Sequence, residues 1–426
     1  MIRRALNMAK MLRHERGSRA RTKRLQDKAF LRLFRHAYEN VPFYRDLYRA
    51  NGISIADIRS LADIGKLPVV SKEQLRGAAA SGKLWGKTDN YRVVETSGSS
   101  GSPFRFYVSR HDNEWRKAQF LLPYVSTGRK PWNSVLRIWG RTPLNKTWPQ
   151  KFGLYNETFI ETGRPAGEHY DALAELEPDY LQGNPSVLRL LAVHMLSNNL
   201  PRPDLKKVYT DSELFYPETR ALLKRAFNAD VIDVFGSYET DNIAYECSEH
   251  SGYHLAEDSV VVETATDGNF QSVDGIGELV CTVLHNTVTP FIRYNLRDLV
   301  GLSSEPCGCG RTSKKLSVLH GRTDDLFTLP DGSKRSSVTV IILCTTFFLH
   351  RVNEFQIRQI DASRFEIRLV PGKSFEQLDI EEFESAFSTQ FPFARPTIRI
   401  VDRIERTAGG KYKAFIGLDS ADRVSS

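Results

Sequence analysis

The middle of the chain alternates short apolar runs with helix-like stretches, and this alternation limits the folds that the sequence can adopt. Apolar, strand-like runs occupy residues 135–139, 231–235 and 277–283, while residues 185–196 and 217–226 have a helical pattern. Strands that alternate with helices predict an α/β fold, in which helices cover a sheet. The 426 residues are too many for one compact core and predict two or three domains.

A domain boundary is expected near residue 321. We predict a large domain over residues 1–320, with a basic helical preface at 1–50, and a small α+β domain over 321–426. The smaller part has its own strand-like runs and its own helical pattern, at residues 355–360, 365–370, 397–402 and 380–391.

The net charge of +8 is concentrated in residues 1–28. This segment holds ten Lys or Arg against two acidic residues, so the remainder of the chain is neutral. A neutral body argues against a nucleic-acid binder. The basic segment could lie on an anionic membrane, bind an acidic partner or act as an organellar transit peptide. The simplest alternative is a solvated helix that docks through Ala5, Met8, Met11 and Leu12.

The cysteine content and the apolar runs indicate the compartment. The chain has five cysteines and no recognisable secretory signal, so we expect reduced thiols in a cytoplasmic protein, peripheral to a membrane if residues 1–28 bind one. The longest apolar run, residues 338–349, is too short to cross a bilayer. A monomer or a homodimer is expected.

A loop of small and hydroxyl residues lies between two strand-like runs, residues 91–95 and 104–108. Gly98 and Gly101 can adopt positive φ, so successive backbone N–H groups can turn toward one anion. Hydroxyl groups would add further donors. Such a loop can wrap phosphate, and the alternative is a flexible surface linker. Its residues are Thr96, Ser97, Gly98, Ser99, Ser100 and Gly101.

Four later segments carry polar side chains that suit a nucleotide site. Gly236 permits a tight turn that presents Glu239 at the carboxyl end of a strand, where α/β folds bind ligands. Asp298 is expected at the end of another strand, where its carboxylate can accept both hydroxyls of a ribose. Residues 321–325 lie on the predicted boundary, and Lys411 lies on a glycine-containing loop.

The order and spacing of these segments resemble the adenylate-forming superfamily. Within it, the chain is most similar to the branch of phenylacetate-CoA ligases and CapK-like proteins of capsular polysaccharide biosynthesis. The resemblance covers nearly the whole chain and includes residues 37–45, 67–72 and 181–186. It implies an adenylation domain with several sheets, a mobile lid domain, and ATP and Mg²⁺ as cofactors.

The resemblance also implies a role for each matching residue. The Ser/Gly loop would close over the β- and γ-phosphates of ATP, Lys411 would stabilise charge at the α-phosphate, and Glu239 would hold Mg²⁺. Asp298 would bind the ribose and Asp324 would be the hinge of the lid. The other nucleotide contacts implied are Ser212, Glu213, Phe235, Gly236, Ser237, Tyr238 and Arg322.

A second constellation resembles a segment in which some members of this branch bind structural zinc. Three thiolates and one imidazole would complete a closed tetrahedral site that stabilises the fold. His250 competes with His254 as the imidazole ligand. The four ligands expected are Cys247, His254, Cys307 and Cys309.

The chain departs from the family where the acyl acceptor binds. Residues 326–333 replace the Gly-containing segment that helps to form the pantetheine tunnel in CoA-forming members. The expected activity is ATP-dependent activation of a carboxylic acid, with CoA as the first acceptor to test. An amine or hydroxyl acceptor in polysaccharide or natural-product biosynthesis is the alternative. A non-catalytic nucleotide-binding scaffold is the second alternative.

Overall fold

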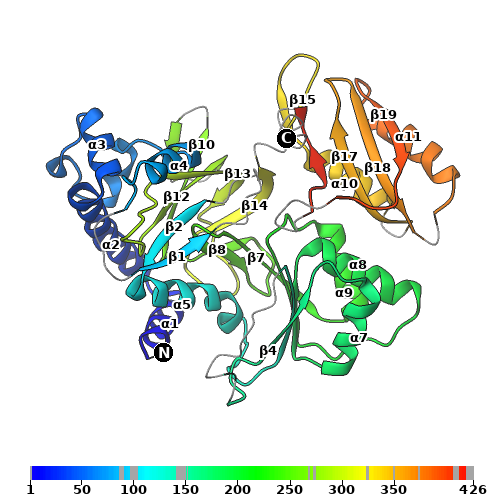
Figure 1. Cartoon of the computed structure of the whole chain (residues 1–426), viewed down its shortest axis with the longest axis horizontal. Coiled ribbons are helices and arrows are strands. Elements are labelled where there is room, and N and C mark those ends of the chain that lie inside the picture. The colour runs from blue at the N-terminus through cyan, green and yellow to red at the C-terminus, as the bar shows by residue number, and fades with distance from the viewer. Residues whose placement is uncertain are drawn as a thin grey trace. The chain divides into compact units, whose positions relative to one another are not determined.

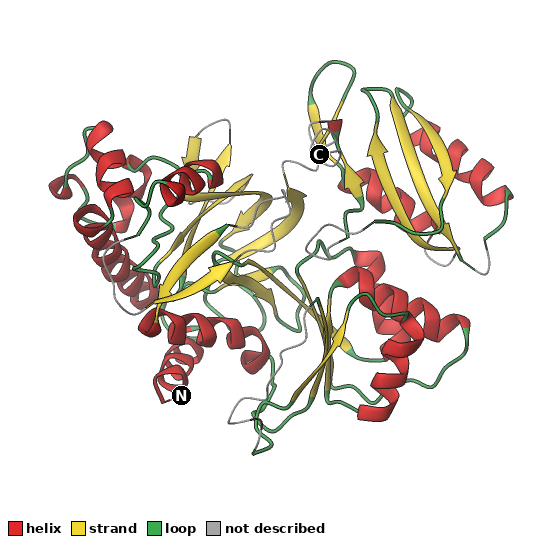
Figure 2. Ribbon diagram, in the orientation of Figure 1, coloured by secondary structure: helices red, strands yellow, loops and turns green. Residues whose placement is uncertain are grey.

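In a computed structural model, the chain folds into two compact units (Figure 1). Each unit is built from two separate segments of the chain. The first unit contains Met1–Arg129 and Val234–Leu319, and the second contains Lys130–Asp233 and His320–Ser426. The structure describes residues 2–85, 91–95, 104–140, 150, 152–266, 269–271, 275–322, 326–348, 351–372, 375–405 and 412–418. The predicted α/β class is confirmed by the mixture of helices and sheets in Figure 2. That residues 321–426 form a lid domain that moves separately stays a prediction.

The first unit begins with helices that are delimited by capping residues. The Ser18 side chain caps the start of α2, and Pro42 occupies the first turn of α3, where its missing N–H costs nothing. Met8 and Met11 are the buried apolar residues of α1 and pack with Leu12 against α5. The docking expected of residues 1–28 is therefore confirmed for these three side chains, whereas Ala5 is exposed. The helices are α1 (Ile2–His14), α2 (Arg19–Asn40), α3 (Pro42–Ala50), η1 (Ile55–Asp57), η2 (Leu61–Lys66), α4 (Lys72–Ala80) and α5 (Arg110–Ser126).

The strands of the first unit form an antiparallel sheet and a separate hairpin. Within this unit the strand order is β11-β10-β12-β13-β14-β9-β8-β7, and β1 pairs with β2. The bounds are β1 (Tyr91–Glu95), β2 (Arg105–Ser109), β7 (Asp230–Ser237), β8 (Asp241–Glu246), β9 (Tyr253–Leu255), β10 (Val260–Thr266), β11 (Asn269–Gln271), β12 (Gly275–Val283), β13 (Tyr294–Ser303) and β14 (Lys315–Arg322).

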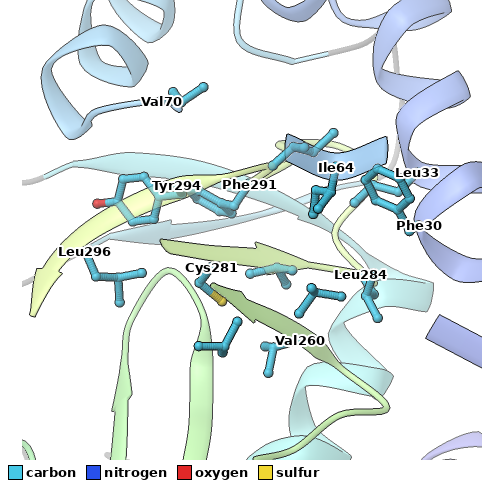
Figure 3. Close-up of a cluster of buried hydrophobic side chains, with 14 of the residues drawn as sticks. Phe30, Leu33, Ile64, Val70, Val260, Cys281, Leu284, Phe291, Tyr294 and Leu296 are labelled. Atoms are coloured by element: carbon cyan, nitrogen blue, oxygen red, sulfur yellow. The ribbon is translucent and has the colours of Figure 1, made fainter. Parts of the chain in front are cut away.

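The main core of this unit lies between α2 and the sheet (Figure 3). Phe30 and Leu33 of α2 pack in one buried cluster with Phe291 and Tyr294. Val70 belongs to the same cluster and forms a parallel bridge with Tyr294, in which the Val70 N–H donates to the Arg293 carbonyl at 2.9 Å. The start of α4, two residues later, is therefore held against β13.

The second unit contains a parallel sheet with helices beside it and a smaller mixed sheet. The parallel strands β3 (Val135–Trp139), β4 (Glu157–Glu161), β5 (Tyr180–Gly183) and β6 (Lys207–Asp211) are ordered β6-β5-β3-β4. Their helices are α7 (Ala166–Leu176), α8 (Pro185–Ser197) and α9 (Pro217–Phe227). Apolar side chains of these helices fill the core beside the sheet.

The smaller sheet follows in the same unit and has the order β19-β18-β17-β20. Phe348 of α10 and Phe383 of α11 pack with Ile357 and Ile367 of this sheet. In the described part of the chain, no helix combines the length and the apolarity that a bilayer span requires. The elements are β15 (Leu326–Thr328), β16 (Lys334–Ser336), α10 (Val338–Phe348), β17 (Val352–Gln359), β18 (Arg364–Pro371), α11 (Leu378–Gln390), β19 (Arg395–Ile400) and β20 (Phe415–Ile416).

Candidate functional site

The hairpin expected around the Ser/Gly loop is formed by β1 and β2. Glu95 and Arg105, the residues at the loop end of the two strands, are paired in register and their side chains form an ion pair of 3.1 Å. Phe104 and Phe106 are buried and anchor the second strand in the main core. Several predicted site residues lie outside the described residues, namely Thr96, Ser97, Gly98, Ser99, Ser100, Gly101, Asp324 and Lys411.

The turn that presents Glu239 joins β7 to β8 and depends on close backbone contact at Gly236. A Cβ added to Gly236 would lie 2.1 Å from the Asp241 carbonyl oxygen, so only glycine fits. Ser237 closes the turn, because its hydroxyl accepts from the Thr240 N–H at 3.3 Å. Glu239 therefore lies just beyond the carboxyl end of β7, as expected. Of the other residues implied by the resemblance, Phe235 is half-buried and Tyr238 is exposed.

The Glu239 carboxylate is buried and paired with a lysine that the sequence argument did not single out. The residue is 5% exposed. Lys72 Nζ lies 3.0 Å from Glu239 Oε1, and the Tyr294 hydroxyl donates to the same oxygen at 3.3 Å. Burial alone would raise the pKa of Glu239, but the charge of Lys72 and its hydrogen bond outweigh burial, so the pKa is lowered. The carboxylate is ionised and directed at a cation.

Lys72 is positioned by the start of α4. Ser71 and Gln74 form a capping box, in which the Ser71 hydroxyl accepts from the Gln74 N–H at 3.2 Å and the Ser71 N–H donates to Gln74 Oε1 at 2.8 Å. Lys72 is therefore the first helical residue, where the helix dipole disfavours a cation. A lysine at the first helical position, inside the capping box of Ser71 and Gln74, was the sequence signal for an anionic partner at this point.

The backbone around Glu239 is held by two side chains of α5. Arg116 donates to the Tyr238 carbonyl at 2.8 Å and forms an ion pair of 3.0 Å with Asp241. Gln119 Nε2 donates to the Thr240 carbonyl at 2.9 Å. Burial raises the pKa of Asp241 to about 6, although Arg116 opposes this. The turn is thus fixed on both sides of Glu239.

Asp298 lies inside β13 rather than at the end of a strand, which corrects the expectation. The pairing of β12 with β13 shifts register between Glu278 and Val280, and the facing segment of β13 bulges. Arg297 in the bulge has a φ of 60° and lies 3.5 Å from Glu73 of α4. Asp298 is half-buried. Asp298 therefore lies in the bulge, and α4 contacts both the bulge and Glu239.

The remaining predicted nucleotide contacts belong to the second unit. Ser212 is exposed with a φ of 71°, and its hydroxyl donates to Asp211 at 2.7 Å. The Glu213 carboxylate accepts from the Ser186 N–H and from the Tyr412 N–H, each at 3.0 Å. Glu213 therefore joins the first turn of α8 to the residue that follows Lys411. Arg322 is exposed at the end of β14.

The four predicted zinc ligands converge in the first unit. Their ligand atoms all lie within 4.8 Å of one another. Cys247 Sγ lies 3.6 Å from Cys307 Sγ, and Cys309 Sγ lies 3.3 Å from His254 Nε2. Two thiolates on one tetrahedral zinc ion are separated by about 3.8 Å, given Zn–S bonds of about 2.3 Å. The donor set fits zinc, with His254 as its imidazole; His250 instead lies 3.7 Å from Glu246.

The surroundings of the cluster suit a metal ligand set. The His254 Nδ1 atom faces the Ser313 hydroxyl at 3.2 Å, which leaves Nε2 toward the thiols. Burial lowers the pKa of His254 to about 4, and the charges of Arg311 and Lys315 act in the same direction. The imidazole is therefore neutral at pH 7. The pKa of Cys307 falls to about 7 despite its burial, chiefly through its hydrogen bond with Ser251.

Comparison with known proteins gives relatives but no matching family model. Protein CapK of Staphylococcus aureus is 25% identical over 92% of this chain and 88% of its own length. The phenylacetate-coenzyme A ligase of Thermus thermophilus is 24% identical over 73% of this chain and 72% of its own. The indoleacetate–lysine synthetase of Pseudomonas savastanoi is 24% identical over 50% of this chain and 54% of its own.

Solved structures share the fold over almost the whole chain. A 2-hydroxyisobutyryl-CoA ligase in the postadenylation state, in complex with 2-HIB-AMP, has a TM-score of 0.80 at 22% identity and covers 97% of this chain and 94% of its own. The same ligase with 2-HIB-AMP and CoA in the thioesterification state has a TM-score of 0.64 over 95% and 91%. The resemblance to adenylate-forming ligases, and to the phenylacetate-CoA ligase and CapK branch, is confirmed.

Proposed function

We propose that this chain, whose fold matches that of solved CoA ligases and whose relatives include phenylacetate-coenzyme A ligases, activates a carboxylic acid with ATP and passes the acyl group to an acceptor. The observation that carries the proposal is the buried, ionised Glu239 carboxylate with Lys72 at 3.0 Å. A carboxylate that faces a cation at the end of a strand suits Mg²⁺ and phosphate chemistry.

The activation step forms one bond and breaks one. An oxygen of the substrate carboxylate attacks the α-phosphorus of ATP, the bond to the bridging oxygen breaks, and pyrophosphate leaves with its electron pair. Glu239 would hold Mg²⁺, which offsets charge on the phosphate oxygens. Lys72 cannot stay 3.0 Å from the same Glu239 oxygen when a divalent cation is bound there. We therefore expect its ammonium group to turn toward the phosphates.

The other residues keep the roles that the resemblance implies. Residues 96–101 would enclose the β- and γ-phosphates, Asp298 would bind the ribose, and Lys411 would stabilise charge at the α-phosphate. Arg322 and the segments 212–213 and 235–238 would complete the nucleotide site, with Asp324 as the hinge between the two half-reactions. Glu213 supports this set, because its carboxylate holds the residue next to Lys411.

CoA is the acceptor that we propose first. The relatives include phenylacetate-coenzyme A ligases, and the structural neighbours include a CoA ligase with CoA bound. An amine or hydroxyl acceptor is the second candidate, because indoleacetate–lysine synthetase and CapK are also relatives. Mass spectrometry of the product, with CoA supplied or omitted, separates these two candidates.

Structural zinc is a further part of the proposal. Cys247, His254, Cys307 and Cys309 would bind one ion and close the loops around it. We also propose that the enzyme is a monomer or a homodimer. Its proposed location is the cytoplasm, peripheral to a membrane.

The test is pyrophosphate release over a panel of aryl, fatty and amino acids. We expect release that requires both Mg²⁺ and one class of acid, and a loss of about 100-fold or more in Lys411→Ala. Tight ATP binding without turnover on any acid would instead favour the nucleotide-binding scaffold. Normal carboxylate-dependent pyrophosphate exchange in Lys411→Ala would remove the role of Lys411.

A further inference from the structure

Five cations follow one another along the outer face of α2. Their spacing is i, i+3, i+7, i+11 and i+14, which places them within one stripe of a helix with 3.6 residues per turn. All five are exposed, and at 1.5 Å per residue the stripe is about 21 Å long. The opposite face of α2 is buried through Phe30, Leu33 and Phe34. We call the stripe the cationic ridge: Arg21, Arg24, Lys28, Arg32 and Arg35.

The ridge is only partly offset by the rest of the protein, because the charge of Arg21 acts on Asp258, where it opposes the rise in pKa that burial causes. Within the described residues, no ion pair involves any of its five side chains. Other basic residues nearby are paired with the body: Arg4 with Glu114 at 3.2 Å and His14 with Asp258 at 2.6 Å. Arg19 is likewise paired with Glu257. These contacts fasten α1 and the start of α2, while the ridge faces solvent.

The outer face of α1, the helix that precedes α2 in the chain, exposes apolar side chains. Ile2 and Leu6, one helical turn apart, are 81% and 57% exposed. Arg3, Lys10 and Arg13 are exposed on the same helix. Met8 and Met11 face the opposite way and are buried against the body. Apolar tips flanked by cations are typical of helices that lie in a membrane interface.

We infer that the cationic ridge and the outer face of α1 form a docking surface for an anionic lipid bilayer. The ridge is a straight line of charge that a flat layer of anionic headgroups can neutralise along its whole length. Ile2 and Leu6 would enter the headgroup region, where aliphatic side chains gain from leaving water. A nucleic-acid duplex would neutralise the ridge but would offer these two side chains no apolar partner.

Flotation of the full-length protein with lipid vesicles tests the inference. One set of vesicles is phosphatidylcholine alone, and in the other set one third of the lipid is phosphatidylglycerol. We expect binding to the anionic vesicles only, and weaker binding at high salt. The triple variant Arg24→Glu, Lys28→Glu, Arg32→Glu should lower the partition coefficient by at least about 100-fold, since each cation near the surface contributes about fivefold.

The matched control reverses three exposed cations elsewhere, through Arg202→Glu, Arg335→Glu and Arg403→Glu, with the same change in net charge. It should keep most of the vesicle binding, whereas Leu6→Gln should weaken binding at every salt concentration. Equal binding to neutral vesicles, equal loss in both triple variants, or binding to a DNA duplex without binding to vesicles would overturn the inference. Pyrophosphate exchange is measured for each variant independently of vesicle binding. Exchange at the parent rate shows that a variant is folded and still forms the adenylate.

Discussion

Glu239 and Lys72 form the residue pair on which the proposed chemistry depends. Lys72→Met would leave the buried Glu239 carboxylate without its cation and would remove the positive charge that we propose for the phosphate region. We expect carboxylate-dependent pyrophosphate exchange to fall by about 100-fold. Lys66→Met is the control, because Lys66 pairs with Asp63 on the surface at 2.7 Å. Unchanged exchange in Lys72→Met would show that this lysine serves only to neutralise Glu239.

Ionisation of Asp241 should lower the free energy of unfolding as the pH rises. Its pKa is raised by burial to about 6 in the folded protein, from an ordinary value near 3.8. The folded state therefore holds this proton more tightly, and ionisation costs stability as the pH rises from about 4 to 6. The free energy of unfolding of Asp241→Asn, relative to the parent, should increase over this window by up to about 3 kcal/mol. Urea unfolding at several pH values measures it, and a constant difference would contradict the assignment.

The turn between β7 and β8 is the element that fixes the position of Glu239. Gly236→Ala would place a Cβ 2.1 Å from a backbone oxygen of β8, so the turn would have to open. We expect a loss of at least about 3 kcal/mol in the free energy of unfolding. Gly77→Ala is the matched control, because a Cβ there meets nothing within 4 Å and α4 gains up to about 1 kcal/mol in helix propensity. Equal stability of the two variants would refute the packing argument.

The cysteine and histidine cluster joins the loop after β8, strand β9 and the loop before β14. Metal analysis of the purified protein should find one zinc ion per chain, and chelation should lower the thermal midpoint by about 5 °C or more. His254→Ala should lose the ion. Cys344→Ala, which changes a buried thiol of the second unit, should retain it. Purified protein without stoichiometric zinc would remove the metal proposal.

At the scale of the whole molecule, the sequence predicted the elements better than their associations. The runs at 135–139, 185–196 and 217–226 are β3, α8 and α9 within a residue or two, because apolar periodicity is a local property. The bulge at Asp298 was missed, since it arises from register with β12 rather than from any local pattern.

The candidate site shows the same limit. Glu239 was identified from its own segment, whereas its partners Lys72 and Tyr294 come from positions far away in the sequence. Contacts such as the packing of Val70 against β13 and the Arg297–Glu73 ion pair bring them together. The family resemblance assigns roles one segment at a time. It therefore identified Glu239 but not Lys72, the lysine that faces it.

Oxygen-18 in the substrate carboxylate shows whether the acid attacks the α-phosphate of ATP, as proposed. Once an acid that supports pyrophosphate release is known, the labelled acid is converted with ATP and the acceptor, and the AMP and inorganic phosphate are analysed by mass spectrometry. An acyl-adenylate leaves one labelled oxygen in AMP when the acyl group is transferred. We predict label in AMP and none in inorganic phosphate. Unlabelled AMP, or label in inorganic phosphate, would contradict the proposed function.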